Sequence, residues 1–174
     1  MKGHLGMSAI INNTFFYSKR QRDQFKKRKL LKEWYGQYPQ IFDDDDFRLT
    51  VDQPEGHYFE WLSAILIFHN SGYLSLVEKY QFKSHKRKHD ILKQFASSGQ
   101  ISAELYDLII NGKKYGFGKS QCPDLFVYSP HHNDWYFCEA KGEDIITLSQ
   151  VKYFEKLSEI SGKAIQLIKY RAID

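Results

Sequence analysis

The chain has few cysteines and no long apolar stretch, and both features limit the classes of protein to which it can belong. Its 174 residues include two cysteines, Cys122 and Cys138. They form neither a CxxC pair nor a disulfide framework, and no histidine stands at zinc-ligand spacing from them. The longest apolar stretch, at 61–68, is much shorter than the about 20 residues of a membrane-spanning helix. The first residues are polar and interrupted by glycines, unlike a signal peptide. We therefore expect a protein of the reducing cytoplasm without a membrane partner.

The basic residues are concentrated in two segments, although the net charge is only +4. A charge this small is a weak indication of a nucleic-acid partner. The distribution of the basic residues is more informative, because a polarised basic surface is typical of proteins that bind phosphates. An ordinary solvated helix surface is the alternative for each segment. The residues expected to contact phosphate are Lys19, Arg20, Arg22, Lys26, Lys27, Arg28 and Lys29 in the first segment, and Lys86, Arg87 and Lys88 in the second.

The length and a hydrophobic content of 42% suit one folded domain with a small extension. Apolar periodicity, caps and turn residues predict the elements along the chain. We expect a loose arm at 1–14, a basic helix at 18–36 and a loop at 37–51. The elements expected after it are helices at about 54–71, 84–96, 102–110 and 148–160, and strands at 114–118, 125–128, 135–140 and 164–169.

This order of helix, strands, helix and strand predicts an α/β fold with a small mixed sheet. A basic N-terminal arm and helix at 1–51 would precede a core domain at 52–174. The helices within about 73–112 would form an insert in that domain. No internal repeat is visible.

Two acidic residues and a lysine stand at the ends of the two clearest strands. Asp124 opens the first strand, and Glu139 and Lys141 close the second. The segment between the strands, 129–134, is a turn by composition, so the strands form a hairpin. Glu139 and Lys141 are two positions apart, so their side chains face the same side. The hairpin therefore brings two carboxylates and an ammonium group together.

Such a group of side chains is suited to metal-assisted cleavage of a phosphodiester. Mg²⁺ prefers hard oxygen ligands, which Asp124, Glu139 and the Ala140 carbonyl can supply. Lys141 can hold or help to deprotonate the attacking water. Glu55, placed by helical periodicity on the buried side of the helix at 54–71, could complete the metal ligands.

Each of these residues also has an ordinary structural explanation. Asp124 could make a turn hydrogen bond, and Glu139 and Lys141 could be a surface cross-strand pair. Glu55 could be a first-turn acid that interacts with the helix dipole. The combination is more specific than any of its parts. Glu60 lies off the apolar stripe of its helix and is the reserve candidate for a ligand.

Three further groups of polar residues could bind a cation or approach the site. His131 and His132 could bind a metal, but a turn between two strands explains them more economically. The four acids at 43–46 could bind a cation, but a solvated loop is favoured. His57 stands close to Glu55 in sequence and could approach the same site.

Three segments of the chain resemble the PD-(D/E)xK nucleases of the VRR-NUC branch. The matching residues are 123–127, 137–142 and 148–150, with Tyr153, Phe154, Leu157 and Gly162. The resemblance covers about 52–170 with gaps and is most specific over 122–162. Upstream, 55–57 resembles the opening of the catalytic helix in the Fanconi-associated nuclease. The resemblance implies a restriction-endonuclease-like core. It also implies that Glu55, Asp124 and Glu139 hold Mg²⁺ or Mn²⁺, that Lys141 is the catalytic lysine, and that Gln150 supports the site.

The function implied is a divalent-metal-dependent deoxyribonuclease, an endonuclease that cuts flaps, forks or junctions in DNA repair or recombination. Small relatives of this type can act as homodimers, so a homodimer is a further expectation. In a bacterium the protein would be associated with the nucleoid. The alternative is a catalytically inactive nuclease-fold module that binds DNA or a protein. A nuclease of a phage-defence or toxin system is a third, weaker hypothesis.

Overall fold

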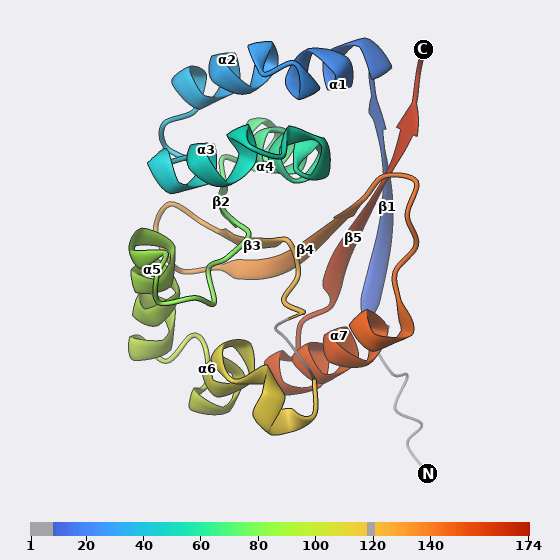
Figure 1. The fold of residues 1–174 in the computed structure, drawn as a ribbon. Coiled ribbons are helices and arrows are strands. Elements are labelled where there is room, and N and C mark those ends of the chain that lie inside the picture. The colour runs from blue at the N-terminus through green and yellow to red at the C-terminus, as the bar shows by residue number, and fades with distance from the viewer. Residues whose placement is uncertain (1–8, 118–120) are drawn as a thin grey trace.

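The computed structural model describes residues 9–117 and 121–174. Within these residues, five strands form one mixed sheet in the order β1-β5-β4-β3-β2 (Figure 1). The strands are β1 (Ile10–Tyr17), β2 (Leu74–Val77), β3 (Leu125–Tyr128), β4 (Trp135–Lys141) and β5 (Ile165–Ala172). The α-helices are α1 (Lys19–Lys26), α2 (Lys29–Gln37), α3 (Asp44–Val51), α4 (Tyr58–Ser71), α5 (Lys86–Ser97), α6 (Ala103–Ile110) and α7 (Leu148–Ser161). The expected mixed α/β fold is therefore confirmed.

The pairing of the strands follows the order of elements along the chain. Strands β2, β3 and β4 pair antiparallel, and β5 returns through α7 to lie parallel to β4. Strand β1 lies at the outer edge, parallel to β5 along its whole length. Helix α4 precedes β2, and α5 and α6 lie between β2 and β3 in sequence. From α4 onward, the order is thus helix, three antiparallel strands, helix and parallel strand, with two helices inserted.

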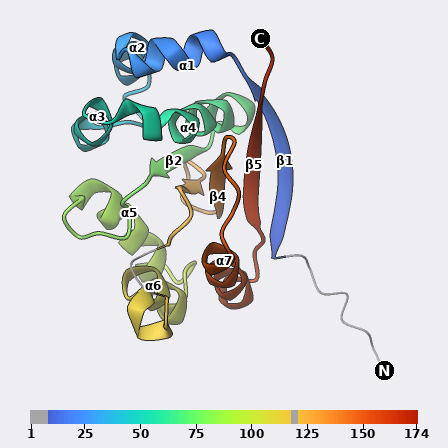
Figure 2. The ribbon, with the colours of Figure 1, turned by 45° about the vertical axis from the view of Figure 1, so that its right-hand side comes forward.

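Helices cover both faces of the sheet. Helices α1 to α4 lie on one side, and α5 to α7 lie on the other (Figures 1 and 2). In β3, Leu125 and Val127 belong to the core under the first group, whereas Phe126 and Tyr128 belong to the core under the second. Successive side chains of a strand point to opposite faces, and here both faces are buried. This double burial explains the continuous apolar sequence of β3.

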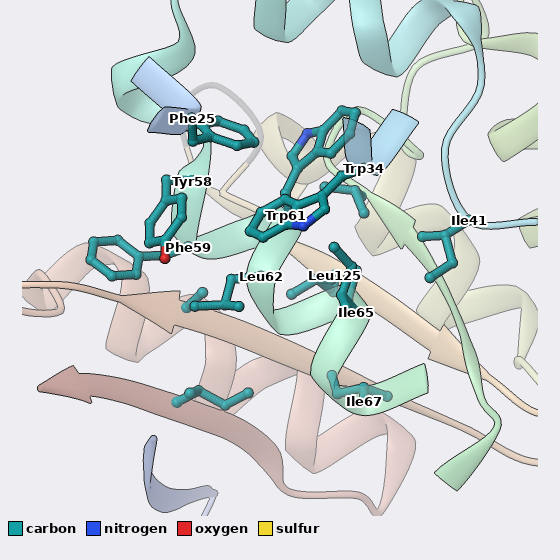
Figure 3. Packing of buried hydrophobic residues seen from close by; sticks show 14 of the residues in the cluster. Phe25, Trp34, Ile41, Tyr58, Phe59, Trp61, Leu62, Ile65, Ile67 and Leu125 are labelled. Carbon is teal, nitrogen blue, oxygen red and sulfur yellow. The ribbon is translucent and has the colours of Figure 1, made fainter. Parts of the chain in front are cut away.

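Aromatic packing holds the N-terminal helices against α4. Trp61 of α4 stacks on Phe42, with ring centroids 3.7 Å apart and an interplanar angle of 7°. Phe25 of α1 meets Trp34 of α2 and Tyr58 of α4 at 5.4 Å (Figure 3). Burying aromatic side chains of this size contributes several kcal/mol. The segment that precedes α4 therefore shares the core of the sheet.

Several expectations for this N-terminal segment are wrong. Residues 10–14, expected in a loose arm, belong to β1. The basic helix at 18–36 is two helices, because Arg28 adopts a left-handed conformation with φ 66° and ends the first. The loop expected at 37–51 contains α3, which Asp43 and Asp46 open with a reciprocal capping box. A local pattern cannot indicate β1, since its pairing with β5 joins the two ends of the chain.

The central elements agree better with the sequence. The strand at 125–128 and the turn at 129–134 are confirmed, with Ser129 N donating to the Asp134 carbonyl at 2.9 Å. Helices α5, α6 and α7 begin and end within about two residues of the expected positions. The strand expected at 114–118 is wrong over 114–117, because residues 112–115 form a 3-10 helix and 116–117 form no strand, and its end at 118 lies outside the described residues. Strand β2, only four residues long, has no counterpart among the expected elements.

Among the described residues, the longest helices, α4 and α7, each have 14 residues. No helix there has the length and apolar character needed to cross a membrane.

Candidate metal centre

Three carboxylates converge where α4 meets the ends of β2 and β3. They are Glu60 of α4, Glu78 directly after β2 and Asp124 directly before β3. One carboxylate oxygen of each lies within 4.8 Å of the others. The register explains the meeting of the last two residues, because Val77 pairs with Leu125 and the Glu78 amide donates to the Asp124 carbonyl at 2.7 Å. The three oxygens are close enough to share one cation.

Glu139 of β4 is joined to this group through Asp124. Leu125 pairs with Cys138, so Asp124 and Glu139 are opposite each other one step beyond the ladder. The Asp124 amide donates to Glu139 Oε2 at 3.0 Å, and the Ala140 amide donates to Asp124 Oδ2 at 2.9 Å. Because N–H and C=O of one strand residue point the same way, the Ala140 carbonyl also faces the Asp124 side. Both carboxylates are thus oriented by backbone groups.

Lys141 and Gln150 meet the other oxygen of Glu139. Lys141 Nζ lies 3.0 Å from Glu139 Oε1, and Gln150 Nε2 donates to the same oxygen at 3.0 Å. Gln150 is held in turn, because its Oε1 accepts from the Thr147 amide at 3.0 Å in the capping box of α7. Four sequence-predicted residues, Asp124, Glu139, Lys141 and Gln150, therefore form one connected network.

Glu55 does not belong to this network, and its expected position on the buried side of a helix is wrong. It is exposed in a 3-10 turn at Pro54–Gly56, where it lines a surface hollow with Lys26 and Arg28. Helix α4 begins only at Tyr58, so helical periodicity cannot be extended back to residue 55. Glu60, the reserve candidate, lies in the carboxylate group instead. It was placed off the apolar stripe, but α4 is buried on several sides and has no single stripe.

The close approach of Phe59 to Gly142 fixes the start of α4 against the end of β4. A Cβ added at Gly142 would lie 2.2 Å from Cε2 of Phe59, so only glycine leaves room for this ring. The ring also stacks on Tyr170 of β5, with centroids 4.9 Å apart. Glu60 is the next residue after Phe59. The packing of the ring therefore positions the carboxylate that sequence reasoning ranked second.

Sequence reasoning missed Glu78 altogether, and it left the role of His57 open. Glu78 Oε2 lies 2.6 Å from His57 Nδ1. The backbone of Glu78 is left-handed, with φ 52°, a conformation that residues other than glycine adopt rarely. Its carbonyl accepts from Lys88 Nζ at 3.1 Å, which helps to hold the turn. Only recognition of β2 as a strand could have indicated Glu78, since it stands at the end of that strand.

The carboxylates lie in an environment that disfavours their charge. Burial raises the pKa of Asp124, and the Glu139 and Glu60 carboxylates raise it further. Burial also raises the pKa of Glu60, and the neighbouring Glu78 adds to the shift. Burial raises the pKa of Glu139 as well, although Lys141 opposes this. A divalent cation would offset both the cost of burying the negative charges and the repulsion between them. The donor set therefore fits Mg²⁺ or Mn²⁺.

The pKa of Lys141 is also raised, and for a lysine this favours the charged form. Burial opposes its positive charge, but the Glu139 carboxylate, together with Asp124 and Asp144, raises the pKa of the ammonium group. Lys141 is therefore charged at neutral pH and stays beside the acids as a fixed cation.

The two basic segments differ in how much charge they leave free. In the first, Lys19, Arg20, Lys27 and Lys29 are exposed, and Arg22 lies over the ring of Phe59 at 4.9 Å. In the second, Lys88 is only 1% exposed, forms an ion pair with Asp46 and donates to the Val77 carbonyl at 2.5 Å.

The partners of the second segment overturn two expectations. Arg87 Nε donates to Asp43 Oδ2 at 2.6 Å, so Arg87 and Lys88 are committed to partners inside the protein. Phosphate contact by the buried Lys88 is therefore contradicted. The solvated loop expected at 43–46 is also wrong, because Asp46 is 2% exposed. Lys86 is exposed and pairs with Asp90 at 2.5 Å.

Comparison of the chain with protein-family models gives no match, and comparison with curated proteins and with solved structures finds no significant similarity. The geometry of the site therefore carries the functional argument.

Proposed function

We propose that this protein is a divalent-metal-dependent nuclease that hydrolyses DNA phosphodiester bonds on a restriction-endonuclease-like core. The observation that carries the proposal is the convergence of Glu60, Glu78 and Asp124 within 4.8 Å, beside the Glu139–Lys141 pair. The order of α4, three antiparallel strands, α7 and parallel β5 supports it. Partly buried acids that face one another need a cation as partner.

Glu60, Glu78 and Asp124 would hold Mg²⁺ or Mn²⁺. The Ala140 carbonyl would point to the side of β4 on which Asp124 lies. A divalent ion bound there supplies Lewis acidity and lowers the pKa of a bound water towards neutrality. His57 keeps Glu78 in position through its contact at 2.6 Å.

Glu139 and Lys141 would act on the reacting phosphate. The Lys141 ammonium group, 3.0 Å from Glu139, is placed to orient a water and to offset the charge that develops on phosphorus. Gln150 fixes Glu139 from the start of α7. The reaction is direct hydrolysis: water attacks phosphorus, the bond to the leaving oxygen breaks, and that oxygen takes up a proton.

The exposed cations of the N-terminal helices would position the substrate. Lys19, Arg20, Lys27 and Lys29 are exposed on α1 and around its junction with α2. Such residues contact phosphates without reading the base sequence. A preference for flaps, forks or junctions is part of the proposal and rests on the sequence resemblance alone.

The test is a panel of labelled flap, fork, four-way junction, single-stranded and duplex DNA, incubated with Mg²⁺, with Mn²⁺ or with EDTA. We expect cleavage that EDTA abolishes, and its loss in Lys141→Ala with DNA binding retained. Full activity of a purified Lys141→Ala protein would refute the assigned role. Binding of DNA without cleavage under every condition would instead support the inactive-module alternative.

A further inference from the structure

Strand β1 leaves one edge of the sheet open within the described part of the chain. It is the last strand in the order β1-β5-β4-β3-β2. Figures 1 and 2 show no described helix or strand beyond it. Proteins commonly protect such an edge with charged residues, proline or a bulge. The sequence of β1, Ile-Ile-Asn-Asn-Thr-Phe-Phe-Tyr, contains no charged residue and no proline, and its eight residues pair with β5 without interruption.

The backbone of β1 directs alternate residues towards this open edge. The Ala9 carbonyl accepts from the Ile165 amide at 2.8 Å, and the Tyr17 carbonyl accepts from the Ile173 amide at 3.0 Å. The backbone N–H and C=O groups of the odd-numbered residues therefore point towards β5. Because hydrogen-bonding groups alternate along a strand, those of Asn12, Thr14 and Phe16 point outward. These three residues offer a row of donors and acceptors to another strand.

The side chains of this edge are arranged symmetrically about Asn13. Residues 10–16 read apolar, apolar, polar, polar, polar, apolar, apolar. If two copies of β1 pair antiparallel about a two-fold axis at Asn13, Ile11 of one copy lies opposite Phe15 of the other. In the same register Ile10 lies opposite Phe16, and Asn12 lies opposite Thr14. Every apolar residue then meets an apolar residue, and every polar residue meets a polar one.

Neighbouring registers lack this match. A two-fold axis at Thr14 would set Asn12 against Phe16 and Asn13 against Phe15. An axis at Asn12 would set Ile11 against Asn13. Two of the apolar residues are also unusually open to solvent, since Ile11 is 45% and Phe16 60% exposed. Cross-strand apolar pairs each contribute about 0.2–1 kcal/mol beyond the backbone hydrogen bonds.

We propose that β1 is the interface of a homodimer, in which two copies of this chain pair antiparallel through Asn13 and join their sheets into one continuous sheet. The inference does not depend on the proposed nuclease activity. On one face, the Ile11–Phe15 pairs would extend a mostly apolar hollow that these residues already line with Ile168 and Cys138. On the other face, Phe16 would lose its exposure against Ile10.

A cysteine at the symmetry position tests the register. In the proposed pairing the two Asn13 positions form a non-hydrogen-bonded pair with Cα atoms about 4.5 Å apart, within disulfide range. Asn13→Cys should therefore crosslink to a dimer under mild oxidation. The matched control is Asn12→Cys, because the two Asn12 positions would lie about 8–9 Å apart and should not crosslink. The wild-type protein controls for Cys122 and Cys138. Equal crosslinking of both variants, or crosslinking of Asn12→Cys alone, would overturn the proposal.

The mass in solution tests the interface itself. Light scattering of the wild-type chain should give twice the monomer mass of 20.6 kDa. Thr14→Pro should give the monomer mass with an unchanged circular dichroism spectrum, because the lost N–H faces the open edge and not β5. If Thr14→Pro does not fold, Phe16→Glu provides the same test, since it sets a carboxylate opposite Ile10. A wild-type chain that is monomeric at about 100 µM would refute the dimer.

Discussion

Two groups of acidic side chains lie close together in this fold, and they differ in how their charge is compensated. Asp43 and Asp46 at the start of α3 face Arg87 and Lys88 of α5, with one cation for each acid. Glu60, Glu78 and Asp124 face one another, with Lys141 bound to Glu139 beside them. The first group is complete within the protein. The second has more negative charge than the described side chains around it balance.

The pKa values follow this division only in part. Burial opposes the ionisation of Asp43, but hydrogen bonds from Arg87 and from the Asp46 amide lower its pKa to about 2. Burial raises the pKa of Asp46 to about 6 against the attraction of Lys88, so this acid is still charged at neutral pH. In the second group burial and the other carboxylates both raise the pKa of Asp124. A cation beside each acid opposes the effect of burial in the first group, whereas acids that face one another indicate a site for a cation.

The largest effect should follow from removing one acid of the uncompensated group. Asp124→Asn keeps the size of the side chain but removes a charged ligand, so cleavage should fall by about 10³-fold. The free energy of unfolding without metal should stay the same or rise, because a repulsive charge is lost. Cleavage rates and urea unfolding measure the two effects.

Glu55→Gln is the matched control for this comparison, because Glu55 is an exposed acid outside the group. Its cleavage rate should equal that of the wild type. A loss of cleavage in Glu55→Gln as large as in Asp124→Asn would show that the wrong glutamate has been assigned.

Removing a cation from the compensated group should give the next largest effect, and on stability. Lys88→Met keeps the length of the side chain but leaves Asp46 buried without its ion pair. Breaking a buried pair in this way costs about 3–5 kcal/mol. Lys86→Met, in an exposed pair with Asp90, should change the free energy of unfolding by less than about 1 kcal/mol. Equal unfolding midpoints in urea for the two variants would show that the buried pair contributes no more than the exposed one.

The comparison also shows which parts of the site the sequence could predict. Asp124, Glu139 and Lys141 lie on one hairpin, where strand periodicity and a short turn determine which side chains meet. Gln150 was assigned by resemblance, and it contacts Glu139 from the next helix. Over such short separations, local pattern and contact in space agree.

Glu60 and Glu78 required information that local patterns do not contain. The direction of Glu60 depends on Phe59, whose ring packs against Gly142 more than 80 residues later in the chain. Glu78 follows a four-residue strand that exists because it pairs with β3 across an insert of two helices. Lys88 and Asp46 were interpreted as surface residues because charged residues usually are. Long-range packing decided all of these positions.

The smallest predicted effect concerns pH, and it separates the two acidic groups by their response to metal. In the unfolded chain, aspartate and glutamate titrate near pH 4. The raised pKa values of Glu60, Asp124 and Glu139 mean that the folded protein binds more protons than the unfolded chain above that pH. The free energy of unfolding in EDTA should therefore fall as pH rises from about 4 towards 7.5. Mn²⁺ at about 100 times its Kd should restore about 2.7 kcal/mol at pH 7.5. Asp124→Asn should flatten the pH dependence and abolish the response to Mn²⁺, whereas Lys86→Met should retain both. An unfolding midpoint in urea that does not respond to Mn²⁺ in the wild-type protein would show that the carboxylates hold no cation.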